Sequence, residues 1–117
     1  MVKDDCIFCK LANKVIPTDV VYENDEVMAF NDANPQMPVH VLIVPKQHYD
    51  NIGDDIPEEL LGRMFAAVKE VARIKGVEDS GYRVLVNTGA DAGQVVNHVH
   101  IHVLGGAPMN DGNPSVR

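Results

Sequence analysis

Residues 98–104 read His-Val-His-Ile-His-Val-Leu, and two glycines follow directly. Histidine alternates with aliphatic residues, a pattern typical of a strand that has one polar and one apolar face. Alternation puts His98, His100 and His102 on the same face, with neighbours about 6.5–7 Å apart. A single buried histidine is commonly structural, but three of the chain's five histidines on one face indicate a functional site. Three imidazoles in a row suit a phosphate group or a metal ion.

The length and charge of the chain restrict its possible functions. One domain is expected from 117 residues, which we assign to residues 1–106, with a polar tail over 107–117. No apolar run approaches the roughly 20 residues that span a bilayer, and the acidic N-terminus leads into no apolar signal region. A net charge of −7 disfavours nucleic acid as a partner, since that binding needs clustered lysine and arginine. We therefore predict a cytoplasmic protein without a nucleic-acid or membrane partner, and a small phosphorylated ligand remains compatible.

Periodicity along the chain predicts two helices and five strands. The predicted helices cover residues 6–12 and about 57–75, and the predicted strands cover residues 19–22, 26–30, 39–44, 82–87 and 98–104. Asp54 or Asp55 is expected to cap the long helix, with Pro57 in its first turn and Gly76 after its last turn. Short turns between strands favour antiparallel pairing, with the long helix over one face. The predicted class is α+β, with a five-stranded antiparallel sheet, one long helix and one short helix.

The histidine strand carries side chains suited to covalent chemistry at phosphorus. A neutral imidazole nitrogen attacks phosphorus well, and the resulting phospho-imidazole still reacts with water, which divides one difficult displacement into two easier steps. The attacking ring must be held by a hydrogen bond to its other nitrogen, while a second histidine can donate to the phosphoryl oxygens. His100 has a histidine on either side, so it is the expected nucleophile. The glycine-rich turn over residues 88–94 offers backbone N–H groups to an anion, and Asn87 and Gln94 add side-chain donors.

The two cysteines, Cys6 and Cys9, form a C-x-x-C pair close to the N-terminus. Two thiolates at this spacing suit one tetrahedral zinc ion, which needs two further ligands, and His48 and His98 are the candidates. A redox-active pair is the second possibility, although that role is typical of a βαβ setting that is not predicted here. Two buried thiols without a function are the third possibility.

The stretch 98–104 matches the H-φ-H-φ-H-φ-φ signature, in which φ is hydrophobic, of the histidine triad (HIT) proteins. Four further motifs resemble the Hint branch of that family in content and order: Cys-Ile-Phe-Cys-Lys at 6–10, Ala-Phe-Asn-Asp at 29–32, Pro-Val-His-Val-Leu-Ile-Val-Pro-Lys at 38–46 and Asn-Thr-Gly-Ala-Asp-Ala-Gly-Gln at 87–94. The resemblance covers almost the whole chain. It implies a homodimer whose subunits join their sheets, a purine nucleoside monophosphate site, and hydrolysis of adenosine phosphoramidates through a nucleotidyl-histidine intermediate.

The resemblance also implies roles for single residues. By position, His100 matches the family nucleophile, His102 the residue that contacts the phosphoryl oxygens and the leaving group, and His40 the fourth family histidine. The residues that correspond to the nucleotide site are Ile16, Phe30, Asp32, Asn87, Gly93, Gln94 and Val95. Among them, Asp32 matches the acid that binds the ribose hydroxyls, and Ile16 and Phe30 match positions that line the base pocket. Without the family context, Asp32 also suits a turn cap, and Phe30 and His40 suit the core.

Several bacterial HIT proteins that resemble this chain hold structural zinc with two cysteines and two histidines. The corresponding residues here are Cys6, Cys9, His48 and His98. The resemblance therefore favours zinc over the redox pair and the inert thiols, in a closed site without an open position for water. His98 is then a structural ligand at one end of the catalytic strand.

Two departures from the family pattern bear on the substrate. Many Hint proteins carry serine directly after the glutamine, where its hydroxyl helps the phosphate or the leaving group, and this chain has Val95. The segment after Gly106 also lacks the tryptophan that some relatives carry near the partner's site. The alternatives to a phosphoramidate hydrolase are a dinucleoside polyphosphate hydrolase, a nucleotide-binding adaptor with weak hydrolysis, and a metalloenzyme that uses His98, His100 and His102 together.

Overall fold

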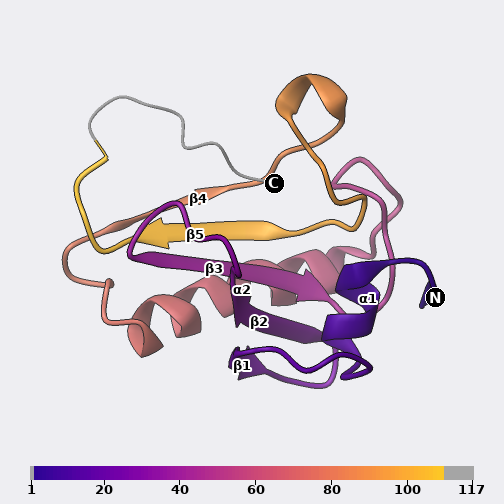
Figure 1. The fold of residues 1–117 in the computed structure, drawn as a ribbon, viewed down its shortest axis with the longest axis horizontal. Coiled ribbons are helices and arrows are strands. Elements are labelled where there is room, and N and C mark those ends of the chain that lie inside the picture. Colours follow the sequence, from indigo (N-terminus) through magenta and orange to yellow (C-terminus); the bar gives the residue numbers. More distant parts are fainter. Residues whose placement is uncertain (1, 110–117) are drawn as a thin grey trace.

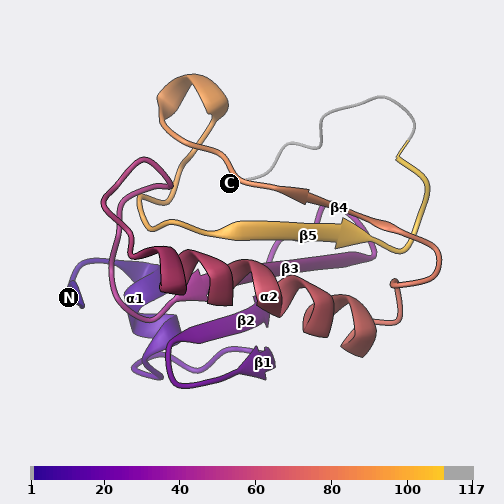
Figure 2. The same cartoon turned by 180° about the vertical axis from the view of Figure 1, so that it is seen from behind.

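The computed structural model describes residues 2–109, which form one sheet with a helix on each face (Figures 1 and 2). In chain order the elements are α1 (Ile7–Ala12), β1 (Val20–Glu23), β2 (Val27–Asn31), β3 (Val39–Pro45), α2 (Glu58–Ile74), β4 (Tyr82–Leu85), a 3-10 turn η1 (Ala90–Ala92) and β5 (Ile101–Gly105). The strand order is β1-β2-β3-β5-β4, and every neighbouring pair is antiparallel. The predicted α+β class, with five antiparallel strands, one long helix and one short helix, is confirmed.

Alternating side chains divide the interior into two cores. Val41 of β3 and Ile101 of β5 belong to the core under α2, whereas Leu42 of β3 packs with Phe8 of α1 on the opposite face. Every residue of β3 is buried, because this central strand has a helix over each face. His102 pairs with Leu42 across the sheet, so it lies on the α1 face. Val99, Ile101 and Val103 belong to the core under α2, so their predicted separation from the histidines holds.

The regular part of β5 is shorter than predicted, since the strand starts at Ile101 and not at His98. Its partner β3 ends at Pro45, which has no N–H group to continue the ladder. The carbonyl oxygen of Pro45 is instead hydrogen-bonded to the ring Nε2 of His98 at 2.8 Å. The backbone N–H of Val99 donates to the carbonyl oxygen of Tyr49 at 2.7 Å, outside the sheet. The first two histidines of the triad thus lie in an extended segment that enters β5.

The predicted cap of the long helix is wrong. Pro57 is the N-cap residue of α2, no side chain caps the helix, and the helix itself starts at Glu58. The Asp54 carboxylate is already used in the preceding turn, where its Oδ2 accepts a hydrogen bond from the backbone N–H of Asp50 at 2.6 Å. Asp55 does not cap the helix either. At the other end, Gly76 follows the helix with a positive φ of 72°, as predicted.

The remaining boundaries shift by a few residues. The strand predicted over 82–87 ends at Leu85, and η1 was not predicted. Most of the predicted tail over 107–117 lies outside the described residues, which end at Met109. Within residues 2–109, none of the helices has the length and apolar character needed to cross a bilayer. The extension of the sheet across a homodimer stays a prediction.

Candidate active site and metal centre

His100 lies just before β5, where neighbouring groups define one of its ring nitrogens and the plane of its ring. Its Nδ1 is 2.6 Å from the backbone carbonyl oxygen of His98, which can only accept a hydrogen bond. In the neutral ring the proton is therefore on Nδ1, and the lone pair is on Nε2. The Phe8 ring packs against the imidazole in a T-shaped arrangement, with centroids 5.0 Å apart and an interplanar angle of 89°. The His102 ring is next to it, at a centroid distance of 4.9 Å.

His102 belongs to a second group of buried polar side chains, which we call the relay cluster: Asp32, His40 and His102. Strands β3 and β5 supply the two histidines, whose Nε2 (His40) and Nδ1 (His102) atoms are 2.9 Å apart. Asp32 follows β2, and its Oδ2 is 3.4 Å from His40 Nε2. All three side chains are almost fully buried. The structure thus brings together three residues that the sequence analysis selected at distant positions.

The glycine-rich turn before the histidines is organised by the Gln94 side chain. Its Oε1 accepts a hydrogen bond from the backbone N–H of Gly89 at 2.9 Å, across η1. Its Nε2 donates to the carbonyl oxygens of Asp50 and Val96, at 2.8 and 3.0 Å. Gly89 and Gly93 both have positive φ angles, which favour glycine. Gln94 therefore shapes the loop in this structure, and its predicted contact with phosphate stays a prediction.

The other predicted nucleotide-site residues differ in exposure. Phe30 is buried at the end of β2, with its ring in a T-shaped contact with Phe8 at 5.6 Å. Ile16 is half-buried in the turn that follows α1, and Asn87 is half-buried after β4. Val95 is 72% exposed, directly after Gln94. An aliphatic side chain at this exposed position offers no hydroxyl group to a leaving group.

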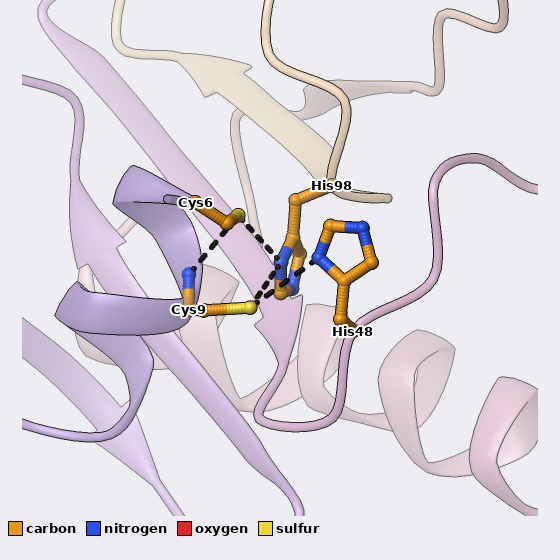
Figure 3. A group of neighbouring side chains, drawn as sticks. All are labelled: Cys6, Cys9, His48 and His98. Carbon is orange, nitrogen blue, oxygen red and sulfur yellow. Dashed lines mark hydrogen bonds between the residues drawn. The ribbon is translucent and has the colours of Figure 1, made fainter. Parts of the chain in front are cut away.

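The second centre is the thiol–imidazole cluster, formed by Cys6, Cys9, His48 and His98 (Figure 3). His98 Nδ1 is 3.3 Å from Cys6 Sγ and 3.4 Å from Cys9 Sγ, and His48 Nδ1 is 3.3 Å from Cys9 Sγ. The four ligand atoms all lie within 4.8 Å of one another. Zinc bond lengths of about 2.3 Å to sulfur and about 2.0–2.1 Å to nitrogen give sulfur–nitrogen edges of roughly 3.6 Å in a tetrahedron. The four residues therefore fit one tetrahedral zinc ion.

Outer hydrogen bonds turn both imidazoles of this cluster toward the thiols. His98 Nε2 donates to the Pro45 carbonyl oxygen at 2.8 Å, and His48 Nε2 donates to Asp50 Oδ1 at 2.7 Å. The proton of each neutral ring is thus on Nε2, and each Nδ1 lone pair faces sulfur, as in metal sites with an ordered outer shell. Burial lowers the pKa of His98 to about 4, which keeps this lone pair available at neutral pH. The hydrogen bond from His48 lowers the pKa of Asp50.

The two thiols of the cluster are suited to binding a cation. Desolvation by burial raises the pKa of Cys9, so without a cation the thiol stays protonated. A metal ion would favour the thiolate and release the proton. A cavity of about 430 Å³, with Cys6, His48 and Asp50 in its wall, borders the cluster and offers an entry path. The donor set of two sulfur and two nitrogen atoms is typical of structural zinc.

The triad histidines do not converge on one metal position. Within residues 2–109, the two groups of metal-ligating side chains are the thiol–imidazole cluster, which contains His98, and the relay cluster, which contains His102. His100 belongs to neither group, and its Nδ1 is bonded to the His98 carbonyl oxygen. This arrangement speaks against the metalloenzyme alternative in which all three histidines bind one ion.

Phe8 is a site residue to which the sequence analysis gave no role. Its ring contacts the rings of His98, His100 and Phe30 in T-shaped arrangements, with centroid distances of 6.1, 5.0 and 5.6 Å. The signal that could have identified it is its place inside the C-x-x-C motif. Two candidate metal ligands that flank a residue on one helical turn would also fix that residue.

The comparisons with known proteins identify the family of the chain. Residues 13–109 match the HIT domain. This chain belongs to the HIT domain family. HitA of Neisseria gonorrhoeae is 47% identical to this HIT protein over 104 residues, which are 87% of this chain and 96% of HitA. A purine nucleoside phosphoramidase of Escherichia coli K12 is 40% identical over 108 residues, 91% of each chain. The structure of a histidine triad protein from Clostridium difficile superposes with a TM-score of 0.90 at 44% identity, covering 97% of this chain and all of that one.

Proposed function

We propose that this protein is a hydrolase that cleaves purine nucleoside phosphoramidates through a nucleotidyl intermediate on His100. The observation that carries the proposal is the 2.6 Å hydrogen bond between His100 Nδ1 and the His98 carbonyl oxygen. It leaves the Nε2 lone pair of the neutral ring for attack, next to the His102 imidazole. The 40% identity to the E. coli purine nucleoside phosphoramidase supports a phosphorus–nitrogen bond as the target.

The proposed reaction has two displacements at the same phosphorus atom. His100 Nε2 attacks the α-phosphorus, the phosphorus–nitrogen bond breaks, and the leaving nitrogen takes up a proton from the solvent and departs as an amine. Water then attacks the nucleotidyl-histidine and gives up a proton to the solvent, the bond from phosphorus to Nε2 breaks, and the nucleoside monophosphate is released. The His102 ring, whose centroid is 4.9 Å from that of His100, would hydrogen-bond to the phosphoryl oxygens in both steps.

The substrate side of the proposal assigns the base and ribose to residues near α1 and β2. Ile16 and Phe30 would line the base pocket, with Phe8 packed behind Phe30 at 5.6 Å. Asp32 would accept hydrogen bonds from the ribose hydroxyls. Asn87, Gly93, Gln94 and Val95 would lie along the phosphate, with backbone N–H groups of the glycine-rich turn as donors. Purine preference within this pocket is part of the proposal.

We also propose that the thiol–imidazole cluster holds a structural zinc ion. The converging ligand atoms and the outer hydrogen bonds of His48 and His98 support this assignment. When bound, zinc would supply a fixed cross-link between α1, the segment after β3 and the segment before β5. Four protein ligands complete a tetrahedron, so we assign it no part in the chemistry. Such a cross-link would preserve the orientation of the His98 backbone. It would thereby hold the carbonyl oxygen that accepts the hydrogen bond from His100 Nδ1.

The proposed assembly is a homodimer in which two sheets join. β4 is an edge strand of the sheet, and its first residue, Tyr82, is 37% exposed. An edge strand with an exposed aromatic residue is suited to pairing with another strand. Sedimentation equilibrium of the purified chain tests this part: a two-chain mass supports it, and a one-chain mass at micromolar concentration contradicts it.

Turnover of an adenosine phosphoramidate and of a diadenosine polyphosphate, each followed by release of adenosine monophosphate, tests the proposed reaction. We expect wild-type protein to hydrolyse the phosphoramidate faster than the polyphosphate, and the H100A variant to hydrolyse neither. Faster cleavage of the polyphosphate would favour the polyphosphate hydrolase. Nucleotide binding without turnover of either compound would contradict the hydrolase.

The exposed Val95 favours one second candidate, a nucleotide-binding adaptor with weak hydrolysis. No hydroxyl group is present at this position to assist the leaving group, which would slow the first displacement. V95S restores the hydroxyl and serves as a direct comparison. A large gain in kcat for V95S with unchanged nucleotide affinity would support an impaired hydrolase, whereas equal and very slow turnover of both proteins would support the adaptor.

A further inference from the structure

The two ring nitrogens of His40 have different hydrogen-bond partners, a donor at Nδ1 and acceptors at Nε2. The backbone N–H of Gln36 donates to His40 Nδ1 at 3.0 Å. On the other side of the ring, Nε2 is 2.9 Å from His102 Nδ1 and 3.4 Å from Asp32 Oδ2. A backbone amide is only a donor, so Nδ1 must be the acceptor and carries no proton. The single proton of the neutral His40 ring is therefore on Nε2.

The Asp32 carboxylate favours the same tautomer independently. Its Oδ1 accepts a hydrogen bond from the backbone N–H of Asn34 at 2.9 Å, which orients the group. The other oxygen faces His40 Nε2, where a negative charge stabilises a bound proton. The donor on one side of the ring and the carboxylate on the other thus both require the Nε2–H form of His40.

The tautomer of His40 determines the tautomer of His102. Because His40 Nε2 carries a proton, it donates to His102 Nδ1, and that nitrogen must hold a lone pair. The proton of the neutral His102 ring is then on Nε2, at the end of the ring away from His40. A hydrogen-bond donor in the loop between β2 and β3 thereby determines which nitrogen of a β5 histidine is the donor.

His100 has the opposite tautomer, because its Nδ1 donates to the His98 carbonyl oxygen. Two imidazoles whose centroids are 4.9 Å apart therefore present different groups, a lone pair on His100 Nε2 and an N–H on His102 Nε2. A nucleophile and a donor to the phosphoryl oxygens require these two forms side by side. A main-chain group determines each tautomer. For His100 it is the carbonyl of His98, and for His102 it is the N–H of Gln36, which acts through His40.

We propose that Gln36 is a positioning residue, whose main-chain N–H fixes the tautomers of His40 and His102 and makes His102 Nε2 a hydrogen-bond donor. The chemical class that this nitrogen would bind is an anionic oxygen, such as a phosphoryl oxygen. The link to catalysis rests on the proposed function, but the tautomer assignment does not. The loop is suited to this task because prolines at 35 and 38 restrict the backbone on either side of Gln36, and Gln36 Nε2 donates to the Asn34 carbonyl oxygen at 3.2 Å.

The decisive test is nuclear magnetic resonance of ¹⁵N-labelled wild-type protein. We expect ¹⁵N shifts of an unprotonated Nδ1 and a protonated Nε2 for both His40 and His102, and the reverse for His100. A scalar coupling across the hydrogen bond between the Gln36 amide nitrogen and His40 Nδ1 is also expected. A protonated Nδ1 on His40 or on His102 would overturn the proposal. This measurement needs no variant, so it decides the matter even if a substitution unfolds the chain.

The matched pair Q36P and Q36A tests the link to catalysis. Proline removes the N–H group, whereas alanine removes the side chain and keeps the N–H group. Q36A is expected to retain the wild-type tautomers, whereas Q36P is expected to populate the Nδ1–H form of His40 and to lower kcat by about 10²-fold, as for the loss of one preorganised donor. Unchanged tautomers in folded Q36P would contradict the proposal. If wild-type protein shows the expected tautomers but no turnover, the proposed function fails and the tautomer assignment stands.

Discussion

The thiol–imidazole cluster and the relay cluster use the same residue type in opposite ways. Each is a buried group of metal-ligating side chains whose ligand atoms lie within 4.8 Å of one another. In the first, both imidazoles bond outward through Nε2, to Pro45 and Asp50, and their Nδ1 lone pairs converge. In the second, the imidazoles bond to each other at 2.9 Å. The outward hydrogen bonds of the first cluster leave its Nδ1 lone pairs facing a position suited to a cation. The hydrogen bond inside the second cluster determines which nitrogen of His102 carries the proton.

One main-chain group connects the thiol–imidazole cluster to His100, the proposed nucleophile beside the relay cluster. The His98 ring belongs to the thiol–imidazole cluster, while its carbonyl oxygen accepts the hydrogen bond from His100 Nδ1. Phe8 forms a second connection, because it lies between Cys6 and Cys9 in sequence and packs on the His100 ring. Substitutions in the two clusters should therefore affect turnover and metal binding separately, except at His98, where both quantities should change.

The largest effect is expected for H100A. Loss of the nucleophile should reduce turnover at least about 10³-fold, which corresponds to roughly 4 kcal/mol in the barrier. Metal content and nucleotide affinity should stay close to wild type, because His100 belongs to neither cluster. Steady-state kinetics, metal analysis by mass spectrometry and nucleotide titration measure the three quantities. Loss of metal in H100A would contradict the separation of turnover from metal binding.

The next largest effect is expected for C9A in the thiol–imidazole cluster. Removing a buried ligand should abolish stoichiometric zinc binding and lower the free energy of unfolding by about 4 kcal/mol, the range of a lost metal site. Urea unfolding of wild-type and C9A proteins, each with and without a chelator, measures the change. Chelator should reduce the stability of wild type and leave C9A unchanged. An equal difference between the two proteins in chelator would show that Cys9 contributes by packing alone.

A smaller effect is expected for D50N, which alters the outer hydrogen bond of the same cluster. Asp50 accepts from His48 Nε2 at 2.7 Å, and loss of such a partner commonly lowers metal affinity by about 10–100-fold. Competition with a zinc-binding dye measures the affinity, and D55N, at an exposed position before α2, is the matched control. Equal affinities for D50N and D55N would contradict the role of the outer shell.

The smallest effect is expected outside both clusters, at Glu23. Its carboxylate pairs with Lys46 at 2.7 Å and with Lys14 at 3.0 Å, and the hydrogen bond from Lys46 lowers its pKa in the folded protein. The pair therefore stabilises the fold above the unfolded pKa, and this contribution is lost as the pH falls through the folded pKa. E23Q should cost roughly 0.5–1 kcal/mol at pH 7 and less in acid. A change in metal content or turnover would show that the two clusters are not the only determinants.

The sequence predicts the fold from residues whose side chains repeat with a clear period. The alternation over 98–104 was sufficient to separate the two faces of β5, and the apolar spacing over 57–75 was sufficient for α2. The strand start was wrong because it depends on Pro45, a residue of the neighbouring strand that ends the ladder. The helix cap was wrong because the Asp54 side chain bonds to the Asp50 amide instead.

Within the site, the sequence could select the histidines and cysteines but not their directions. The C-x-x-C spacing needed two more ligands, and only the fold brings His48 and His98 to the sulfur atoms. Gln36 could not be found from its residue type, because its main-chain N–H makes the contact with His40. The chemistry of side chains can be predicted from the sequence, whereas the hydrogen bonds of the main chain can be assigned only in the folded protein.

The central claim is that His100 carries a covalent nucleotidyl intermediate, and its most direct test is the mass of the intact protein. Wild-type and H100A proteins are mixed with an adenosine phosphoramidate, quenched rapidly without acid and weighed by mass spectrometry. Wild type should show a transient gain of one adenylyl group while adenosine monophosphate is released, and H100A should show neither. Release of adenosine monophosphate in a single turnover without an adduct, or an adduct that persists in H100A, would contradict the account.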